Sequence, residues 1–467
     1  MATSTSRTKS DTDTTPTTGP STADAPKEQL HRPLRSDLTR NLLRSLTEIE
    51  ANGIAQSQAA AANLANRLLL EAHDAGASDI HIEPHQNGSR LRLRIDGIVH
   101  DVIHLTKWQA KTIVNQFKAM ANLDPIIRFS PKDARTTMPL AGNNSLDLRF
   151  AFAPCLNGET VTVRLLDLKR VGRGINELGL SLEQSQRLVE RIDTVTGMLL
   201  IAGPTGVGKT TTVYALLDRL KNTNSTVITI EDPVEYHVDG ITQIQVDEFH
   251  HVGFSEGVKA TLRLDPDYVV IGEIRDKDSA HSAVSAAVTG RVILSTMHSR
   301  DAAGAVSALR NWGLTGHEIA EALSVVVAQR LVRILCPHCR AKSTPTATEK
   351  RWLKAMQLPV PSETWRPVGC EECRQFGFTG RTGIFEIWTL DEDDYSQILG
   401  HVDERALRRH LASKGHRTLV EDGYSKALTG LTTIDELRSV SGGAFPSQHL
   451  PAAPRKRRGR NRATANG

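Results

Sequence analysis

The segment LLIAGPTGVGKTTTVYALL, residues 199–217, places a glycine-rich loop between two apolar runs. Gly203, Gly208, Lys209 and Thr210 match G-x-x-x-x-G-K-S/T, and the flanking runs predict the strand and helix that this motif requires. Helix N-termini attract phosphate, the lysine pairs with the β- and γ-phosphates, and the threonine binds Mg²⁺. The residues expected to bind nucleotide are Gly203, Pro204, Thr205, Gly206, Val207, Gly208, Lys209, Thr210 and Thr211. The alternative, a glycine turn without a ligand, is disfavoured by the adjacent lysine and threonine.

Three acidic or polar clusters follow apolar runs farther along the chain. Glu231 and Asp232 end ITIED, Glu273 follows YVVIG, and His298 follows VILSTM. The charged residues nearest Glu273 in the sequence are Asp265, Asp267, Arg275 and Asp276. A carboxylate at the end of a buried strand is costly unless it binds something, such as metal-bound water. Each cluster alone could be a helix cap or a surface ion pair, but together with the phosphate loop they indicate one site.

Four cysteines form two C-x-x-C pairs. Cys336 pairs in this way with Cys339, and Cys370 with Cys373, with residues 340–369 between the pairs. In a reducing compartment such pairs predict a structural, tetrahedral Zn²⁺ site that leaves no open coordination position. Free structural thiols are the alternative, and His338 could replace one ligand. The remaining cysteine, Cys155, is expected to be buried.

The elements that position these residues fall into two folded parts. A helix near residues 59–75, a β-hairpin turning at Asp96-Gly97, and strands in SLDLRFAFAPC and GETVTVRLLDL predict a small α+β domain that ends near Leu168. After a linker to about Gly179, the apolar runs GMLLIAG, STVITIED, YVVIGEI and RVILSTMH alternate with helical stretches. This alternation predicts an α/β fold with a mostly parallel sheet and helices on both faces.

The whole chain has 467 residues, which favours more than one domain. The expected divisions are a disordered N-terminal region (1–58), the small domain (59–170), the α/β core (171–335), a cysteine insert (336–375), a C-terminal helical region (376–445) and a basic disordered tail (446–467). Helical spacing from Leu34 predicts a helix that either docks a partner or caps its own domain.

The composition is that of a globular protein, with 39% hydrophobic and 24% charged residues. No run of about 18 apolar residues predicts a membrane span, and the N-terminus lacks the apolar core of a secretory signal. We therefore expect a cytoplasmic protein. The net charge of +4 is weak support for a polyanion partner, because part of the excess lies in the tail PRKRRGR.

At this point the sequence resembles the secretion and type IV pilus assembly ATPases of the GspE/PilB group. The similarity runs from about Ala61 to Val440, and its motifs are GPTGVGKTTT, ITIEDPVEY, LRLDPDYVVIGEIRD, STMHSRDA and QRLVRILCPHC. The resemblance implies a RecA-like P-loop NTPase core, a PAS-like small domain, and a zinc insert typical of assembly-type members. It also implies a homo-hexamer that uses ATP and Mg²⁺ and acts at the inner face of the membrane through a platform protein.

The resemblance further implies roles for individual residues. Glu231 would orient or activate the attacking water, Glu273 would hold the magnesium ion, and His298 would sense the γ-phosphate. Arginines of the small domain would reach the nucleotide, and the matching positions are Arg135, Arg149 and Arg164. Each could instead be an ordinary strand arginine facing solvent. Arg291 stands where the family commonly has histidine, and the N-terminal region is too short for the extra domain of many secretion ATPases.

Three functions are compatible with these features. The first is an ATP-driven motor that assembles a pilus or a secretion pseudopilus. The second is a nucleic-acid translocating motor with the same core, although an aromatic content of 4% argues against a base-stacking surface. The third is a nucleotide-binding scaffold without hydrolysis, which would require a missing catalytic group.

Overall fold

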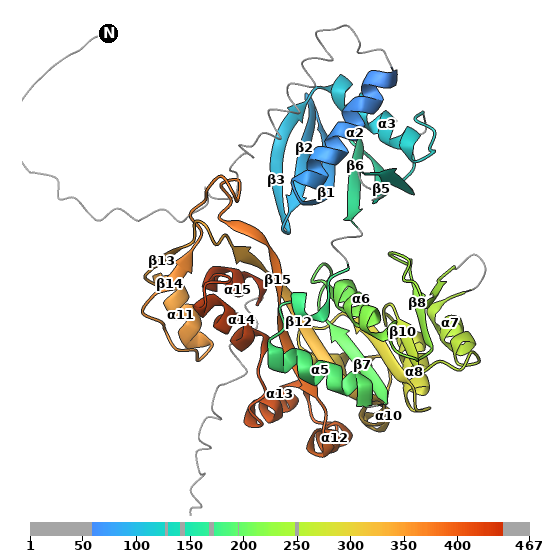
Figure 1. Cartoon of the computed structure of the whole chain (residues 1–467), viewed down its shortest axis with the longest axis vertical. Coiled ribbons are helices and arrows are strands. Elements are labelled where there is room, and N and C mark those ends of the chain that lie inside the picture. Colours follow the sequence, from blue (N-terminus) through green and yellow to red (C-terminus); the bar gives the residue numbers. More distant parts are fainter. Residues whose placement is uncertain are drawn as a thin grey trace, which may run out of the picture.

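The structure is a computed structural model that describes residues 58–126, 129–140, 145–167, 172–194, 196–247 and 252–441. It contains a small domain, drawn at the top of Figure 1, and a larger core below it. The predicted helix from Leu34, the predicted disorder of residues 1–57 and the predicted disordered tail all lie outside the described residues.

The small domain is an antiparallel six-stranded sheet covered by two helices. Its strands are β1 (Ala77–His85), β2 (Gly88–Ile95), β3 (Ile98–Leu105), β4 (Lys132–Pro139), β5 (Ser145–Cys155) and β6 (Gly158–Asp167), in the order β3-β2-β1-β6-β5-β4. Helices α2 (Gln58–Asp74) and α3 (Lys107–Met120) pack on one face through apolar side chains such as Leu68 and Phe117. The predicted hairpin is confirmed, since Asp96 (φ 49°) and Gly97 (φ 85°) turn between β2 and β3.

Strand β5 shows how the sequence pattern selects the two faces of this sheet. Leu146, Leu148 and Phe150 are buried on the helix side, while Arg149 lies on the opposite face. The prediction that Cys155 is buried is wrong, because this residue is exposed. Its pairing with Gly158 closes the β5–β6 hairpin, so Cys155 lies at the turn between these two strands.

The core is a seven-stranded sheet, as the alternating apolar runs predict. Its strands are β7 (Gly197–Ala202), β8 (Val227–Glu231), β9 (Thr242–Gln245), β10 (Tyr268–Ile271), β11 (Val292–Met297), β12 (Leu323–Leu335) and β15 (Phe378–Thr389), in the order β15-β12-β7-β11-β10-β8-β9. All neighbours are parallel except β15, which runs antiparallel to β12.

Helices cover both faces of the core sheet (Figure 1). On one face lie the short helix η3 (Ile175–Glu177), α5 (Leu182–Thr194) and α6 (Lys209–Leu220). The other face carries α7 (Phe254–Thr261), α8 (Lys277–Ala287), α9 (Ala302–Asn311), α10 (Gly316–Ala322), α12 (Glu392–Leu399), α13 (Glu404–Ser413), α14 (Leu419–Leu428) and α15 (Ile434–Val440). Buried side chains alternate along β7, with Met198 facing the second group of helices and Leu199 the first.

The segment predicted to be helical from residue 376 begins instead with a strand. β15 supplies the apolar run GIFEIW, in which Ile384 and Trp388 are buried on one face and Phe385 on the other. Because it pairs with β12 over nearly its full length, it is an edge strand of the core sheet. Helices follow it to Val440, where the sequence pattern placed their end.

The cysteine insert lies between β12 and β15 and contains β13 (Ala341–Ser343), α11 (Ala347–Ala355) and β14 (Thr364–Arg366).

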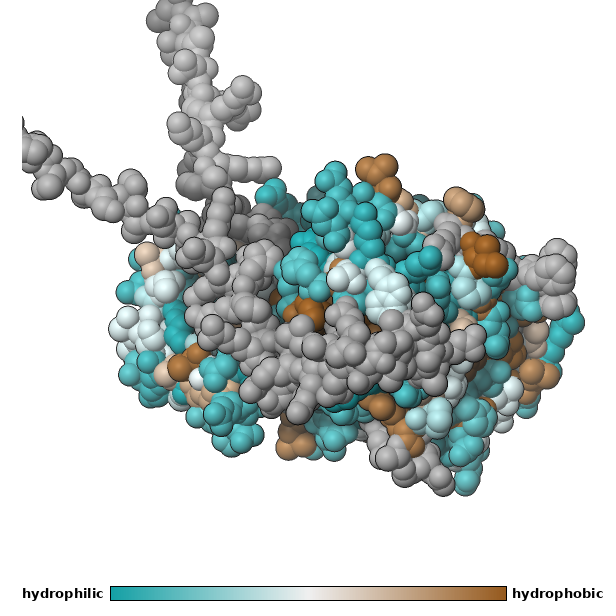
Figure 2. Space-filling model, turned by 90° about the horizontal axis from the view of Figure 1, so that it is seen from above, coloured by the Kyte–Doolittle hydropathy of each residue, from teal (hydrophilic) through white to brown (hydrophobic). Residues whose placement is uncertain are grey.

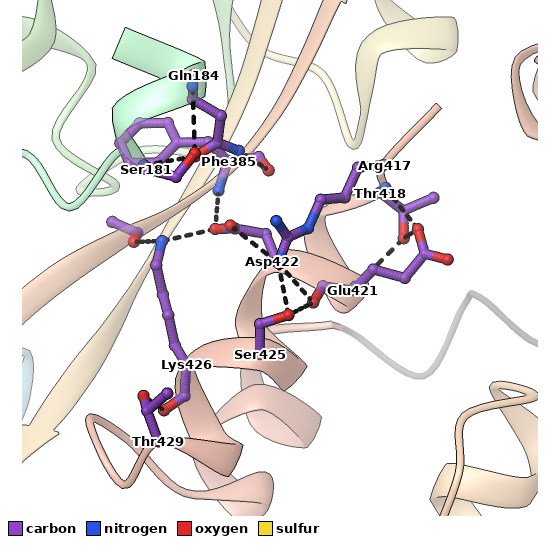
Figure 3. A network of polar contacts seen from close by, with 11 residues as sticks. Ser181, Gln184, Phe385, Arg417, Thr418, Glu421, Asp422, Ser425, Lys426 and Thr429 are labelled. Carbon is purple, nitrogen blue, oxygen red and sulfur yellow. Dashed lines mark hydrogen bonds and ion pairs between the residues drawn. The ribbon is translucent and has the colours of Figure 1, made fainter. Parts of the chain in front are cut away.

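A separate polar network joins β15 to its neighbours (Figure 3). Asp422 of α14 accepts a hydrogen bond from the Phe385 N–H at 3.0 Å, and Lys426 donates to the Gly383 carbonyl at 2.7 Å. The segment leading into α5 docks here too, since the Gly383 N–H donates to the Leu178 carbonyl at 3.0 Å.

Where Figure 2 colours the surface by hydropathy, hydrophilic residues predominate and hydrophobic residues form separate small patches. Among the residues that the structure describes, no helix is both long enough and apolar enough to cross a bilayer.

Candidate nucleotide site

The phosphate loop joins β7 to α6. Gly208 adopts a left-handed conformation (φ 85°) directly before the first residue of α6, Lys209, a backbone angle that disfavours other residues. A Cβ on Gly203 would lie 2.7 Å from the Val207 side chain and 2.8 Å from the Gln329 carbonyl. Thr205, Gly206 and Thr210 are exposed, so the loop opens to solvent at the helix N-terminus. This arrangement can receive a phosphate group.

Lys209, His298 and Glu273 form a continuous polar chain across three strand ends. The Lys209 ammonium lies 2.7 Å from the Gly203 carbonyl and 3.3 Å from His298 Nδ1, and His298 Nε2 lies 2.8 Å from Glu273. His298 Nδ1 also lies 3.2 Å from the Gly203 carbonyl oxygen, so it faces both the lysine ammonium and this oxygen. The contact between Nε2 and Glu273 Oε1 is close but lacks the alignment of a hydrogen bond. Burial lowers the pKa of Lys209, Glu273 opposes the shift, and Arg330 adds to it. The clusters of Glu273 and His298 therefore meet beside the loop.

Glu231 lies at the end of β8 in a different environment. It accepts hydrogen bonds from Tyr214 at 2.5 Å, Thr229 at 2.7 Å and Gln243 at 3.1 Å, and it is buried. Burial and the hydrogen bond to Glu231 raise the pKa of Tyr214. These three donors fix the orientation of the carboxylate.

Not all of the acidic residues near Glu273 in the sequence join the site. Arg275 bridges Glu273 at 2.8 Å and Asp232 at 3.2 Å, and Asp276 caps α8 by accepting from the Ser279 N–H. Asp265 and Asp267 precede β10, at the opposite end of the strand from Glu273. Asp267 accepts from the Thr226 N–H at 2.7 Å, so it has a structural role.

Gln329 is a site residue that the sequence patterns did not reveal. It is buried on β12, donates to the Val207 carbonyl at 2.8 Å and accepts from the Thr212 hydroxyl at 2.8 Å. It therefore fixes the loop and the first turn of α6 from a neighbouring strand. The available signal was an amide side chain inside the apolar run VVVAQRL, which would be costly to bury without partners.

Arg135, Arg149 and Arg164, called here the arginine row, are aligned across β4, β5 and β6. Arg149 forms an ion pair with Glu235 at 2.5 Å, and Arg135 donates to the carbonyls of Val234 and Glu235 at 3.2 and 3.1 Å. Both therefore contact the segment that follows Glu231. Arg164 instead pairs with Asp79 of its own domain at 3.1 Å.

A cavity of about 570 Å³ lies beside the phosphate loop. Gly208, Thr211 and Gln329 line it from the core, and Asp96 and Leu165 line it from the small domain. The loop thus faces a space bounded by both domains.

The four cysteines predicted to bind zinc lie together. All four Sγ atoms are within 4.8 Å of one another, and those of Cys336 and Cys370 are 3.8 Å apart. The Sγ atoms of Cys339 and Cys373 are 3.7 Å apart. A tetrahedron with Zn–S bonds of about 2.3 Å has sulfur–sulfur edges of about 3.8 Å, so the cluster fits Zn²⁺.

The surroundings of the sulfurs also suit a metal-bound thiolate. Burial alone would raise the pKa of Cys373, but N–H groups of Cys370 and Gly377 donate to its Sγ and lower the pKa to about 7. The Gly369 N–H donates to Cys339 at 3.2 Å. His338 is exposed and lies outside the cluster, so in this structure it does not replace a cysteine.

A phosphate loop on a parallel sheet, with acidic side chains at neighbouring strand ends, defines a P-loop nucleotide-binding protein. Residues 55–439 match the type II/IV secretion system protein family, and the chain belongs to this family. The predicted membership of the secretion ATPases is thereby confirmed.

Individual relatives agree with this assignment. Type II secretion system protein E of Pseudomonas aeruginosa is 38% identical over 81% of this chain and 75% of its own length. Type II secretion system ATPase E of Vibrio cholerae is 36% identical over the same shares of the two chains. The X-ray structure of the Legionella pneumophila ATPase DotB superposes with a TM-score of 0.60, covering 81% of this chain and 95% of that one at 19% identity. This likeness confirms the RecA-like fold of the core.

Proposed function

We propose that the chain is the motor ATPase of a type II secretion system or a related type IV pilus, which hydrolyses ATP to drive filament assembly. The contact of Lys209 with the His298–Glu273 pair carries the proposal, because it joins a phosphate-binding lysine to an acidic group at a neighbouring strand end. The name of the Vibrio cholerae relative, a type II secretion system ATPase, supports it.

Each site residue has a role in this proposal. The loop Gly203–Thr211 binds the phosphates, and Lys209 turns from the Gly203 carbonyl to the β- and γ-phosphates. Thr210 and Glu273 hold Mg²⁺, which neutralises charge on the phosphates. His298 senses the γ-phosphate, because its contacts with Lys209 and Glu273 place it next to the residues that bind the phosphates and the magnesium ion.

Glu231 orients the attacking water in this proposal. Its three hydrogen-bond donors keep the carboxylate in a fixed direction, which suits a group that must position a nucleophile. Arg135 and Arg149 stabilise charge on the transferred phosphoryl group after leaving Glu235, and Arg164 is the third candidate. The nucleoside would occupy the cavity beside Thr211.

The motor acts as a homo-hexamer in the cytoplasm, bound at the inner face of the membrane through a platform protein. Nucleotide binding closes the small domain onto the core, and hydrolysis releases it, so binding energy becomes rigid-body motion. Zn²⁺ held by Cys336, Cys339, Cys370 and Cys373 has a structural role, because four cysteines leave no open position on the metal.

ATP turnover by the purified chain with Mg²⁺, alone and with its platform protein, tests the proposal. We expect Lys209→Ala and Glu273→Gln each to lower turnover by at least about 100-fold. Lys350→Ala, an exposed position on α11, is the control that keeps wild-type turnover. Unchanged turnover in both site variants would refute the proposal. Stimulation by single-stranded DNA that falls steeply with salt would support the nucleic-acid motor instead.

A further inference from the structure

The residues that follow the last cysteine contact the small domain. We call residues 374–381 the knuckle segment. Arg374 donates to the Asp74 carbonyl at 3.1 Å, and the Gly380 N–H donates to the Asp96 carboxylate at 2.9 Å. Between them, Phe376 packs against the apolar core of the small domain, and its ring centroid lies 4.7 Å from that of His100. The cysteine cluster is therefore one short turn away from an interdomain contact.

The turn itself is built on the cysteine cluster. Arg374 (φ 52°) and Gln375 (φ 65°) are consecutive left-handed residues without being glycine, a conformation that is sterically unfavourable. The Gln375 N–H donates to the Cys370 carbonyl at 2.8 Å, and the Gly377 N–H donates to Cys373 Sγ at 3.1 Å. Since these bonds start from the second cysteine pair, the geometry of that pair determines where Phe376 points.

The small domain touches the core at a second place, where Arg135 and Arg149 contact residues 234–235. The cavity beside the phosphate loop is lined by the knuckle segment as well as by residues of both domains. A change in how the knuckle segment holds the small domain would therefore also change where these two arginines lie relative to Glu231.

We propose that the cysteine site positions the small domain for catalysis. The bound metal fixes the turn at residues 374–375, the turn seats Phe376 against His100, and this contact places Arg135 and Arg149 over the core. Phe376 is thus a positioning residue that acts through the arginines. The catalytic part rests on the proposed ATPase function, whereas the domain placement is independent of it.

Hydrogen exchange of the nucleotide-free protein tests the placement. We expect Phe376→Ala to keep its zinc but to exchange amides of residues 96–104 at least about tenfold faster than wild type. Asp96→Gly, which tolerates the left-handed turn and removes the carboxylate, gives the same result at this surface. Removal of zinc from the wild-type protein with a chelator also speeds exchange at residues 96–104. Val368→Ala, an exposed position in the same insert, changes neither zinc content nor exchange.

Kinetics tests the link to the arginines. We expect Phe376→Ala to lower kcat, but to have no further effect when it is added to the variant that carries both Arg135→Ala and Arg149→Ala, because the arginine changes already remove the contribution that Phe376 supports. A further loss of kcat in this triple variant would overturn the proposal. So would unchanged exchange at residues 96–104 in zinc-loaded Phe376→Ala or in the zinc-free wild type. If no variant or wild type hydrolyses ATP, the ATPase proposal fails while the exchange result still decides the placement.

Discussion

Two glutamates of the site differ in their partners, and this difference is consistent with different roles. Among the described residues, the hydrogen-bond donors to Glu231 are uncharged, whereas Glu273 contacts His298 and Arg275. A carboxylate between two cationic or protonated partners can exchange one of them for a metal ion. A carboxylate fixed by neutral donors is better suited to orient a water molecule.

The hydroxyl of Tyr214 is expected to matter for turnover through its hydrogen bond to Glu231. Tyr214→Phe removes a hydrogen bond to a carboxylate, worth about 1.5–3 kcal/mol, and leaves Glu231 less constrained. We predict a kcat about tenfold lower, with nucleotide affinity unchanged. Steady-state kinetics and a nucleotide-binding titration measure the two effects.

Tyr236→Phe is the matched control, since the Tyr236 ring lies 4.2 Å from that of Tyr214 and its carbonyl accepts from Gln243. A wild-type kcat in Tyr214→Phe would show that turnover does not depend on the hydrogen bond from Tyr214 to Glu231.

At the scale of elements, strand β15 links the core to the C-terminal helices. Glu386 on this strand is buried and accepts from the Ala302 N–H of α9 at 3.1 Å and the Leu419 N–H of α14 at 3.3 Å. One carboxyl group thereby accepts a hydrogen bond from a backbone N–H group in the first turn of each of two helices, which has no partner within its own helix. Burial and the nearby Asp301 raise the pKa of Glu386 to about 7.

This raised pKa predicts a pH dependence of stability. A carboxyl group whose pKa is higher in the folded state stabilises fully below its unfolded value of 4.5 and loses this contribution as the pH rises through about 7. From pH 5 to pH 8, the free energy of unfolding of wild type should fall by about 2 kcal/mol more than that of Glu386→Gln. Urea unfolding at both pH values measures this, with the exposed Glu392→Gln keeping the wild-type slope. Parallel slopes for wild type and Glu386→Gln would contradict the prediction.

The sequence predicted those parts of the molecule that depend on local pattern. Strands β7, β8, β10 and β11, the loop before α6 and the two cysteine pairs follow from periodicity and spacing. Strand β15 was missed because its partner β12 lies more than 40 residues earlier, across the insert. Gln329 and Tyr214 were missed for the same reason, since their partners are brought near only by the folded sheet.

The relation between the two domains likewise depends on long-range contacts. No local pattern indicates that Arg149 meets Glu235, or that Phe376 meets His100, because each pair joins segments from different domains. The register of β4, β5 and β6 aligns the arginine row. Which of these arginines contacts the core depends on the orientation of the small domain relative to the core. In the described part of the chain, Arg135 and Arg149 bond to residues of the core, whereas Arg164 bonds to Asp79 of the small domain.

The placement of these arginines predicts that each subunit supplies its own. In this chain Arg149 contacts the segment after Glu231 of the same chain, so its arginine and its phosphate loop serve one site. Lys209→Ala removes the phosphate contact and Arg149→Ala removes the arginine, so each variant alone should be nearly inactive. A mixture of the two purified variants, allowed to exchange subunits, should then hydrolyse ATP no faster than the sum of its parts. If a neighbour supplied the arginine, interfaces that join an intact loop to an intact Arg149 would form and activity would return. Recovery of turnover in the mixture would therefore show that Arg149 acts across the subunit interface.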